Sequence, residues 1–245
     1  MEHLQYESFR DCFCKTFEQN GLERLCTDAM IESFAGFTEL LLQVNSHTNL
    51  TAIREVPDII AKHYADCLLA EPYFPSAATV LDVGCGGGFP CIPLAITRPD
   101  LQLTAIDSTA KKIAFVQAAA AAQNLTNLSP ICVRAEDPIM APRKQTFDIG
   151  TSRAVARLSV LIELVLPYVK VGGVLVALKG SAGTEELEES RKGIHVLGGE
   201  TVENHPKMLH FGDIEESRSI IVIQKIRPTP PQYPRPYANI LKKPL

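Results

Sequence analysis

The stretch from Thr79 to Pro90, TVLDVGCGGGFP, constrains the fold of this chain more than any other part of the sequence. A short β-branched apolar run ends in an acidic residue, four glycines follow at positions 84, 86, 87 and 88, and an apolar segment of helical character comes next. This order predicts a strand, a tight turn and the start of a helix. Glycines in such a turn allow positive φ angles and let a ligand approach where a Cβ would clash. The turn is therefore a candidate ligand-binding loop.

The spacing of these glycines distinguishes between possible ligands. Gly84, Gly86 and Gly88 differ from the dinucleotide pattern G-x-G-x-x-G, because Phe89 stands where that pattern has its third glycine. Asp82 would repel a pyrophosphate, but its carboxylate suits a cationic or hydroxyl-bearing ligand. We therefore expect S-adenosylmethionine rather than NAD, and an ordinary strand-to-helix turn without a ligand is the alternative.

A second acidic residue supports a nucleotide-like ligand. Asp107 follows the predicted strand 101–106 and lies 23 residues after Gly84. In doubly wound folds, an acidic residue about 20 residues after the glycines accepts hydrogen bonds from ribose hydroxyls. The alternative is that Asp107 caps the helix that begins near Ala110.

Strands and helices alternate from Thr79 onward, which predicts an α/β fold of the Rossmann-like kind. We expect about seven strands, mostly parallel, with two at the end antiparallel. Polar or charged residues follow four of the strands, so their side chains should share one crevice at the carboxyl edge of the sheet. The predicted strands after the first are 101–106, 129–133, 147–151, 174–178 and 219–225, the helices are 110–123, 158–168 and about 184–192, and Gly172-Gly173 is the predicted turn before the fifth strand.

The flanking segments differ from this alternating core. Residues 1–75 carry helical apolar spacing and predict an N-terminal helical extension to the domain 76–225. His63 lies among apolar neighbours there, which favours a satisfied, partly buried histidine over a substrate contact. Residues 226–245 form a basic, proline-rich tail, which is either solvated or an arm that follows phosphates and stacks bases on its tyrosines.

Composition excludes several classes of protein. The formal net charge of −4 gives no overall basic footprint for nucleic acid, so any such footprint must be a local patch. No run of about 18 apolar residues and no basic leader is present, so we expect a cytoplasmic protein that does not enter a membrane. Seven cysteines without a C-x-x-C pair favour buried thiols, and Cys12 and Cys14 lack a second pair to complete a zinc site, so we expect no metal.

These motifs, in this order, resemble those of the small-subunit ribosomal RNA methyltransferase G family, also called glucose-inhibited division protein B. The resemblance runs from about Asn49 to Lys179. It is carried by Leu81–Pro90, Asp107-Ser108, Arg134-Ala135-Glu136, Phe147-Asp148, Ser152-Arg153-Ala154, Pro167, Gly172-Gly173 and Lys179-Gly180, with Asn49-Leu50-Thr51 and the segment 62–66 as the N-terminal part.

The resemblance implies a class I methyltransferase that transfers a methyl group from S-adenosylmethionine to N7 of a guanine in the 530 loop of 16S ribosomal RNA, near the decoding centre. The partner would be that RNA or the small ribosomal subunit, and we expect a monomer. Gly84 and Phe89 would line the methionine and ribose end, Ala135 and Glu136 would meet the adenine, and Arg153 would lie beside the cofactor at the substrate mouth. With the loop residue Gly86 and the ribose acceptor Asp107, this gives seven predicted cofactor-binding residues.

Departures from the family pattern concern several individual positions. Cys85 stands where threonine is usual, Cys91 where glycine is usual, Lys62 where arginine is usual and Cys67 where serine is usual. The tail keeps only part of the family's basic Tyr-Pro-Arg pattern.

The predicted chemistry needs no general base, because guanine N7 has a free lone pair and no proton. No catalytic base or nucleophile is therefore predicted, and Arg153 is the best candidate for a residue at the reacting centre. The alternatives are a class I methyltransferase for a small metabolite, and a nucleotide-binding module that binds the cofactor without transferring a methyl group. Fold alone does not distinguish these.

Overall fold

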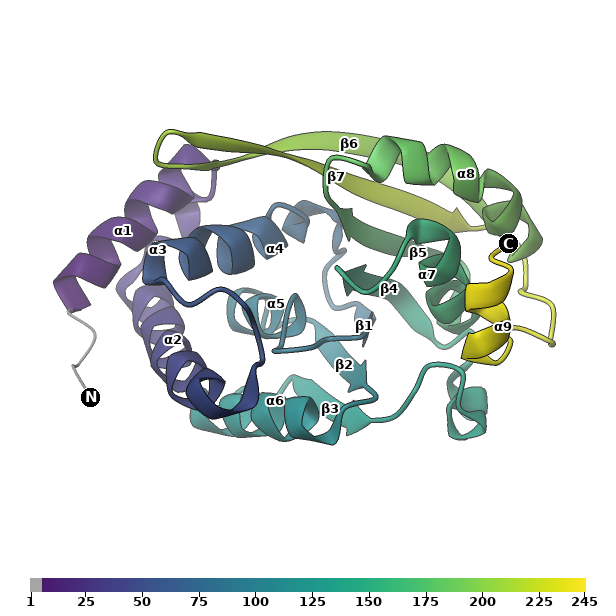
Figure 1. Cartoon of the computed structure of the whole chain (residues 1–245), viewed down its shortest axis with the longest axis horizontal. Coiled ribbons are helices and arrows are strands. Elements are labelled where there is room, and N and C mark those ends of the chain that lie inside the picture. The colour runs from purple at the N-terminus through teal and green to yellow at the C-terminus, as the bar shows by residue number, and fades with distance from the viewer. Residues whose placement is uncertain (1–5) are drawn as a thin grey trace.

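The computed structural model describes residues 6–245 and contains one seven-stranded sheet of order β3-β2-β1-β4-β5-β7-β6 (Figure 1). β1 to β5 pair in parallel, whereas β7 pairs antiparallel with both β5 and β6. This confirms the predicted α/β fold and the antiparallel pairing at one end. The strands are β1 Thr79–Val83, β2 Gln102–Asp107, β3 Leu128–Cys132, β4 Phe147–Arg153, β5 Val169–Lys179, β6 Gly199–Phe211 and β7 Ile214–Lys225.

Helices cover both faces of the sheet, because successive residues of each strand point to opposite sides. Val80 of β1 belongs to a core shared with α1, α2, α5 and α6, whereas its neighbour Leu81 belongs to a second core shared with α7, α8 and α9. The α-helices are α1 Tyr6–Gln19, α2 Asp28–Thr48, α3 Val56–Ile59, α4 Asp66–Leu68, α5 Cys91–Thr97, α6 Ala110–Ala122, α7 Leu158–Val165, α8 Gly183–Val196 and α9 Tyr237–Lys242.

Five short helical segments complete the described chain. The segment η2, between α3 and α4, is a π-helix, and the other four are 3₁₀ helices. π-Helical turns are rare and occur often at functional sites. The segments are η1 Glu23–Leu25, η2 Ile60–Ala65, η3 Glu71–Tyr73, η4 Pro138–Arg143 and η5 Leu166–Tyr168.

The N-terminal helices pack into the same apolar core as the sheet. Phe37 of α2 contacts Phe89 and Phe115, with ring centroids 5.8 and 6.1 Å apart, respectively. The predicted helical character of this region is confirmed for the described residues, and residues 1–5 lie outside them. The domain boundaries at residues 75 and 225 stay a prediction.

The predicted turn at Gly172-Gly173 is wrong, because both glycines lie inside β5. Phe147 pairs with Val169 and Ile149 pairs with Val174, so β5 bulges between these two positions. Gly172 has a φ of 88°, and a Cβ on Gly173 would lie 2.4 Å from the carbonyl oxygen of Asp148. The glycines therefore permit a bulge and not a turn.

Strand β6 received no range in the sequence prediction. It pairs along its length with β7 in a long hairpin that reaches over α1 (Figure 1). Its sequence, GETVENHPKMLHF, is polar and contains a proline, because it forms the edge of the sheet, where proline and charge are tolerated.

The segment 226–245 is folded against the second core and is not a freely solvated tail. The ammonium of Lys225, which precedes it, is fully buried and donates to the carbonyl of Leu166 and the hydroxyl of Thr229, each at 2.6 Å. Arg235 pairs with Glu163 of α7, and Ile240 of α9 is fully buried. Arg227 also donates to the carbonyl of His195 at 3.2 Å. Three of the five basic side chains between residues 225 and 243 therefore have internal partners.

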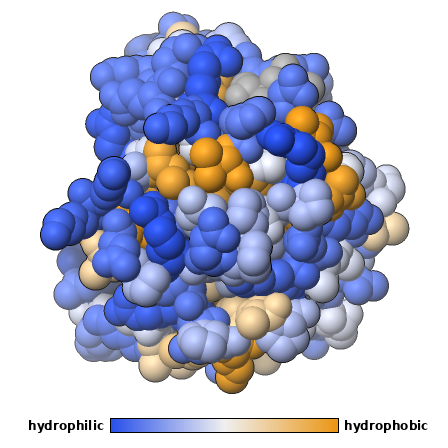
Figure 2. All heavy atoms as spheres, turned by 90° about the vertical axis from the view of Figure 1, so that its right-hand side faces the viewer, coloured by the Kyte–Doolittle hydropathy of each residue, from blue (hydrophilic) through white to orange (hydrophobic). Residues whose placement is uncertain are grey.

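Figure 2 looks onto the side of the molecule that carries α9, and this face is mostly hydrophilic with small separate apolar patches. Among the described residues, no helix combines the length and apolarity needed to cross a membrane.

Gly150, in the middle of β4, tests the packing of α7 on the sheet. A Cβ at this position would lie 2.2 Å from Cγ1 of Val165 and 2.9 Å from Cγ2 of Val169. We expect Gly150→Ala to lower the free energy of unfolding by about 1–3 kcal/mol, because both neighbours belong to a close-packed core. Urea denaturation measures the change. Gly180→Ala, where a Cβ meets nothing within 4 Å, is the matched control, and equal stability of the two variants would contradict the packing.

Candidate functional site

A cavity of about 510 Å³ opens at the carboxyl edge of the parallel strands. Such edges are where open α/β sheets bind ligands, and the volume lies within the ~300–1,000 Å³ typical of small-molecule sites. The structure brings all seven predicted cofactor-binding residues to the wall of this cavity, although their individual roles stay predictions. They are Gly84, Gly86, Phe89, Asp107, Ala135, Glu136 and Arg153.

The glycine loop follows β1 and is tied to β2 by its backbone. The amides of Gly84 and Cys85 donate to the carbonyl of Ile106 at 2.8 and 3.1 Å. Gly84 has a φ of 75°, and a Cβ there would lie 2.4 Å from Cγ2 of Val155. Gly86 has a φ of 55° and faces open space. The loop thus presents backbone rather than side chains to the cavity.

Asp107 ends β2 and connects two elements of the site. One carboxylate oxygen accepts from the amide of Gly86 at 3.1 Å, and the other accepts from the amide of Thr109 at 2.8 Å. Thr109, not Asp107, is the N-cap of α6, so the predicted helix cap is displaced by two residues. Since each carboxylate oxygen can accept two hydrogen bonds, both can still accept from a ligand hydroxyl.

Asp82 does not line the cavity, which corrects the prediction that its carboxylate faces the ligand. It is fully buried on the α5 side of β1, because it alternates with Leu81 and Val83, which face the other core. Its Oδ2 accepts from the amide of Cys91 at 3.2 Å, whereas Oδ1 has no partner among the described residues. Burial raises the pKa of Asp82 to about 7. Its role is to hold the start of α5.

Arg153, at the end of β4, is the best-connected side chain of the cavity wall. Its guanidinium donates to Oδ2 of Asp66 at 2.8 Å and to the carbonyl of Lys62 at 2.9 Å. Its carbon Cζ lies 5.4 Å from the ring centroid of Phe89. Two other carboxylates of the same region do not pair with Arg153, because Arg134 pairs with Glu136 and Lys170 pairs with Asp148.

Asp66 is the ion-pair partner instead, and it binds a second arginine as well. Its Oδ1 accepts from Nε of Arg218 at 2.6 Å, so one nearly buried carboxylate holds two guanidinium groups. The sequence prediction missed this pair because Asp66 and Arg218 are 152 residues apart and no spacing signal connects them.

His63 is a satisfied buried histidine, as the sequence favoured, and it also lines the cavity; a substrate contact stays a prediction. Its ring stacks on Phe89 with centroids 4.1 Å apart. Nδ1 lies 2.9 Å from Nη2 of Arg153 and Nε2 lies 2.8 Å from Oγ1 of Thr51. Because the guanidinium can only donate, Nδ1 accepts and Nε2 carries the proton. Burial, assisted by the charge of Arg153, lowers the pKa of His63 to about 3, so the ring is neutral at pH 7.

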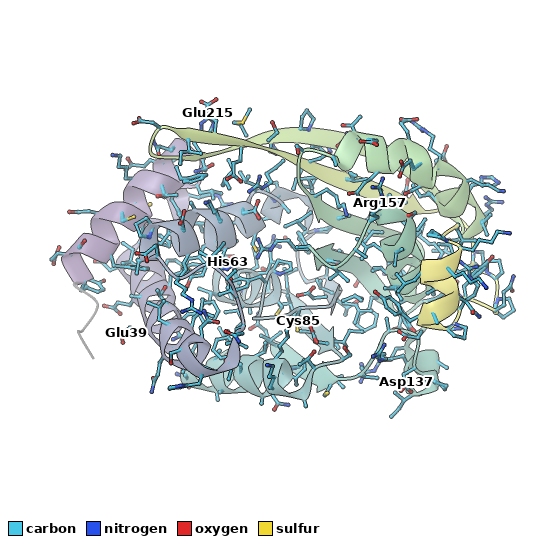
Figure 3. All side chains as sticks on the ribbon, in the orientation of Figure 1. Glu39, His63, Cys85, Asp137, Arg157 and Glu215 are labelled. Atoms are coloured by element: carbon cyan, nitrogen blue, oxygen red, sulfur yellow. The ribbon has the colours of Figure 1, made fainter. Side chains whose placement is uncertain are left out.

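His63 owes its position to the π-helix η2, which gives the backbone between α3 and α4 a local widening. Figure 3 shows the labelled His63 and Cys85 near the centre of the molecule. Cys85 is one of three buried cysteines, whereas Cys132 is exposed and the other three are half-buried, so the expectation of buried thiols holds for only part of the seven. Arg157, also labelled, lies towards α8, where it pairs with Glu189 at 2.5 Å.

A second cavity, of about 530 Å³, adjoins the first and shares His63, Arg153 and Ala154 with it. Its wall carries four cationic side chains and two carboxylates. Both carboxylates are ion-paired, Asp66 with two arginines and Glu186 with Lys179 at 2.7 Å. The cations are Lys62, Arg153, Lys179 and Arg218. Two adjoining cavities therefore meet at Arg153.

Comparison with known proteins places this architecture in a family. The family model described as rRNA small subunit methyltransferase G matches residues 30–211. The chain belongs to this family. A relative in Brevibacillus brevis, the ribosomal RNA small subunit methyltransferase G, is 43% identical over 96% of this chain and 99% of the relative. The protein of the same name in Macrococcus caseolyticus is 42% identical over 95% and 97%.

Solved structures agree on the fold. A variant of the 16S rRNA (adenine(1408)-N(1))-methyltransferase of Catenulisporales acidiphilia is 16% identical, with a TM-score of 0.50 over 62% of this chain and 87% of that chain. This likeness supports the class I methyltransferase fold alone. The methyl donor of the methyltransferase G family is S-adenosylmethionine.

The cavity fits S-adenosylmethionine on the geometry of its own residues. Gly86 leaves room for a ligand beside the backbone, Gly84 lets Val155 pack closely against the loop, and Asp107 keeps acceptor capacity on both carboxylate oxygens. The described residues offer no group of three His, Cys, Asp or Glu side chains placed to hold a metal ion.

Several wall residues were not predicted as site residues. Leu50 and Thr51 come from the loop after α2, Val155 follows Arg153, and Tyr237 belongs to α9. The Asn49-Leu50-Thr51 resemblance was a usable signal for the first two, whereas no spacing signal indicated Tyr237.

The neutral state of His63 predicts a dependence of stability on pH. Its pKa is about 6.5 in an unfolded chain and about 3 in the folded protein, so below pH 6.5 the unfolded state binds the extra proton. The stability that the neutral ring contributes is fully present above pH 6.5. As the pH falls from 6.5 towards 3, the free energy of unfolding decreases by up to about 1.4 kcal/mol per pH unit.

Denaturant unfolding at pH 7.5 and pH 5 measures this dependence. We expect His63→Gln, which can keep both hydrogen bonds, to show a smaller loss of stability than the unsubstituted protein on acidification. An equal loss in both proteins would contradict a neutral, buried ring.

Proposed function

We propose that this protein transfers the methyl group of S-adenosylmethionine to N7 of a guanine in the 530 loop of 16S ribosomal RNA. The observation that carries the proposal is the pair of adjoining cavities. One has the glycine loop and Asp107 suited to the cofactor, and the other has a cationic wall suited to a nucleotide. Arg153 lies at their junction. The relatives named ribosomal RNA small subunit methyltransferase G support RNA as the substrate.

The family resemblance supports a role for each predicted residue of the wall. Gly84 and Phe89 line the methionine and ribose end, Gly86 and Asp107 face the ribose, and Ala135 with Glu136 flanks the adenine. Asp107 accepts from ribose hydroxyls with the lone pairs that the Gly86 and Thr109 amides leave free. Arg153 stands at the substrate mouth, where the ion pair with Asp66 fixes its guanidinium.

The side chains that line the second cavity are consistent with methylation at a nitrogen that carries no proton. S-adenosylmethionine supplies an electrophilic methyl group, and guanine N7 attacks with its own lone pair. No base is needed, and none is free among the described residues of this wall: His63 is hydrogen-bonded at both nitrogens, while Asp66 and Glu186 are ion-paired. The side chains therefore contribute alignment and electrostatics rather than proton transfer.

The RNA meets cations near the two cavities. Lys112 and Arg134 line the first cavity, and Arg134 is 60% exposed, whereas Lys62 and Lys179 of the second cavity are ion-paired with Asp58 and Glu186. Such a local patch compensates for the net charge of −4. We propose further that the protein acts as a monomer in the cytoplasm, where ribosomal RNA is available.

The direct test is incorporation of labelled methyl from S-adenosylmethionine into small-subunit RNA that lacks N7 methylation. Borohydride reduction followed by aniline cleaves RNA at N7-methylguanine, and we expect one cleavage, in the 530 loop. Isolated RNA and intact small subunits are compared to find which form is accepted. Cofactor binding without any labelled RNA would contradict the proposal and favour a small-metabolite substrate.

Arg153→Ala tests the alignment at the junction of the cavities. We expect turnover to fall about 100-fold, the size of effect that a misplacement of about 1 Å can have. The fold should survive, because Asp66 keeps its ion pair with Arg218. Arg157→Ala removes an exposed arginine of the neighbouring loop and serves as the control. Turnover of the Arg153 variant equal to that of the control would exclude the role.

A further inference from the structure

The segment 226–245 reaches the cofactor cavity although it lies outside residues 30–211, which the family model matches. Tyr237, the first residue of α9, lines the cavity together with Leu164 and Val155. Its side chain is half-buried against the second core, and it has no hydrogen-bond partner among the described residues. Figure 1 shows α9 beside α7, the helix that follows β4.

An ion pair fixes the chain two residues before Tyr237. The backbone amide and Nε of Arg235 each lie 2.8 Å from Oε1 of Glu163, and Nη2 lies 2.5 Å from Oε2. Glu163 is fully buried in α7, so Arg235 is what compensates its charge. Charge-assisted bonds to both oxygens of one carboxylate set position as well as energy. We call this pair the Arg235–Glu163 clamp.

Two further contacts hold the segment on either side of the clamp. Nζ of Lys144 donates to the carbonyl of Tyr233 at 2.5 Å, and Ile240 is fully buried three residues after Tyr237. Residues three apart share a face of a helix, so the buried Ile240 turns Tyr237 inward as well. The position of the Tyr237 ring is thus determined by contacts outside the cavity.

We propose that Tyr237 is a cofactor-binding residue, which the Arg235–Glu163 clamp holds as a wall of the S-adenosylmethionine cavity. The ring supplies apolar contact area in a wall that Leu164 and Val155 also line. This inference rests on the proposed function only for the identity of the cofactor. Arg235 acts through the ring and is a positioning residue.

Calorimetric titration with S-adenosylhomocysteine, without RNA, tests the proposal independently of methyl transfer. We expect Tyr237→Ala to weaken binding about five- to tenfold, as removal of a well-packed aromatic contact does. Tyr237→Phe should bind within twofold of the unsubstituted protein, because the ring makes the contact. Asn239→Ala, on the exposed side of α9, is the matched control and should bind normally.

The clamp is tested by a double-variant cycle in the same titration. Arg235→Ala should weaken binding by a factor similar to that of Tyr237→Ala, and the double variant should bind no more weakly than either single one, because both remove the same contact. If the clamp did not act through Tyr237, the losses in affinity of the two single variants would multiply in the double variant. If Tyr237→Ala does not fold, Tyr237→Leu replaces it, with the same expected loss.

The outcomes separate this inference from the proposed function. Binding by Tyr237→Ala within twofold of the unsubstituted protein overturns the inference and leaves the proposed function intact. An unsubstituted protein that does not bind S-adenosylhomocysteine overturns the proposed function, and the inference with it.

Discussion

The carboxylate of Asp107 is the contact on which the arrangement of the cofactor site depends. It accepts from the amide of Gly86 in the loop after β1 and from the amide of Thr109 at the start of α6. One side chain therefore fixes the distance between the glycine loop and the next helix, while keeping lone pairs for a ligand. The loop can follow this path because Gly84 and Gly86 adopt positive φ angles. A strand end, a loop and a helix start become one rigid wall.

The substrate side is organised by a different constraint, the burial of charge. Arg153 is nearly buried at the junction of the two cavities, and it is tolerated there because Asp66 accepts from it and His63 stays neutral beside it. Its two terminal nitrogens have three partners, which hold the guanidinium in place, whereas its buried Nε has no partner among the described residues. Electrostatic positioning is the kind of catalysis that a proton-free nucleophile requires, so the cluster agrees with the proposed reaction.

Much of the fold and the cofactor wall could be predicted from the sequence, because those features are local. The glycine loop and the alternation of strands and helices are patterns within about thirty residues, and the position of Asp107 follows from the strand it ends. Features that depend on distant pairing could not be predicted. Asp66 meets Arg153 and Arg218 across the fold, β6 lacks the alternation of a half-buried strand, and Tyr237 belongs to a segment that Glu163 and Lys144 hold from distant parts of the chain. The prediction for Asp82 was wrong for another reason. The sequence shows that Asp82 points to the opposite face from Leu81 and Val83, but it does not show that α5 covers that face.

A crystal structure with bound S-adenosylhomocysteine tests the central claim most directly. It should place ribose hydroxyls within hydrogen-bonding distance of the Asp107 carboxylate while that carboxylate still accepts from the Gly86 amide, with the adenine beside Ala135. A ribose held elsewhere, or an Asp107 that gives up the Gly86 amide to bind it, would contradict the account of a preformed wall at the carboxyl edge of the sheet.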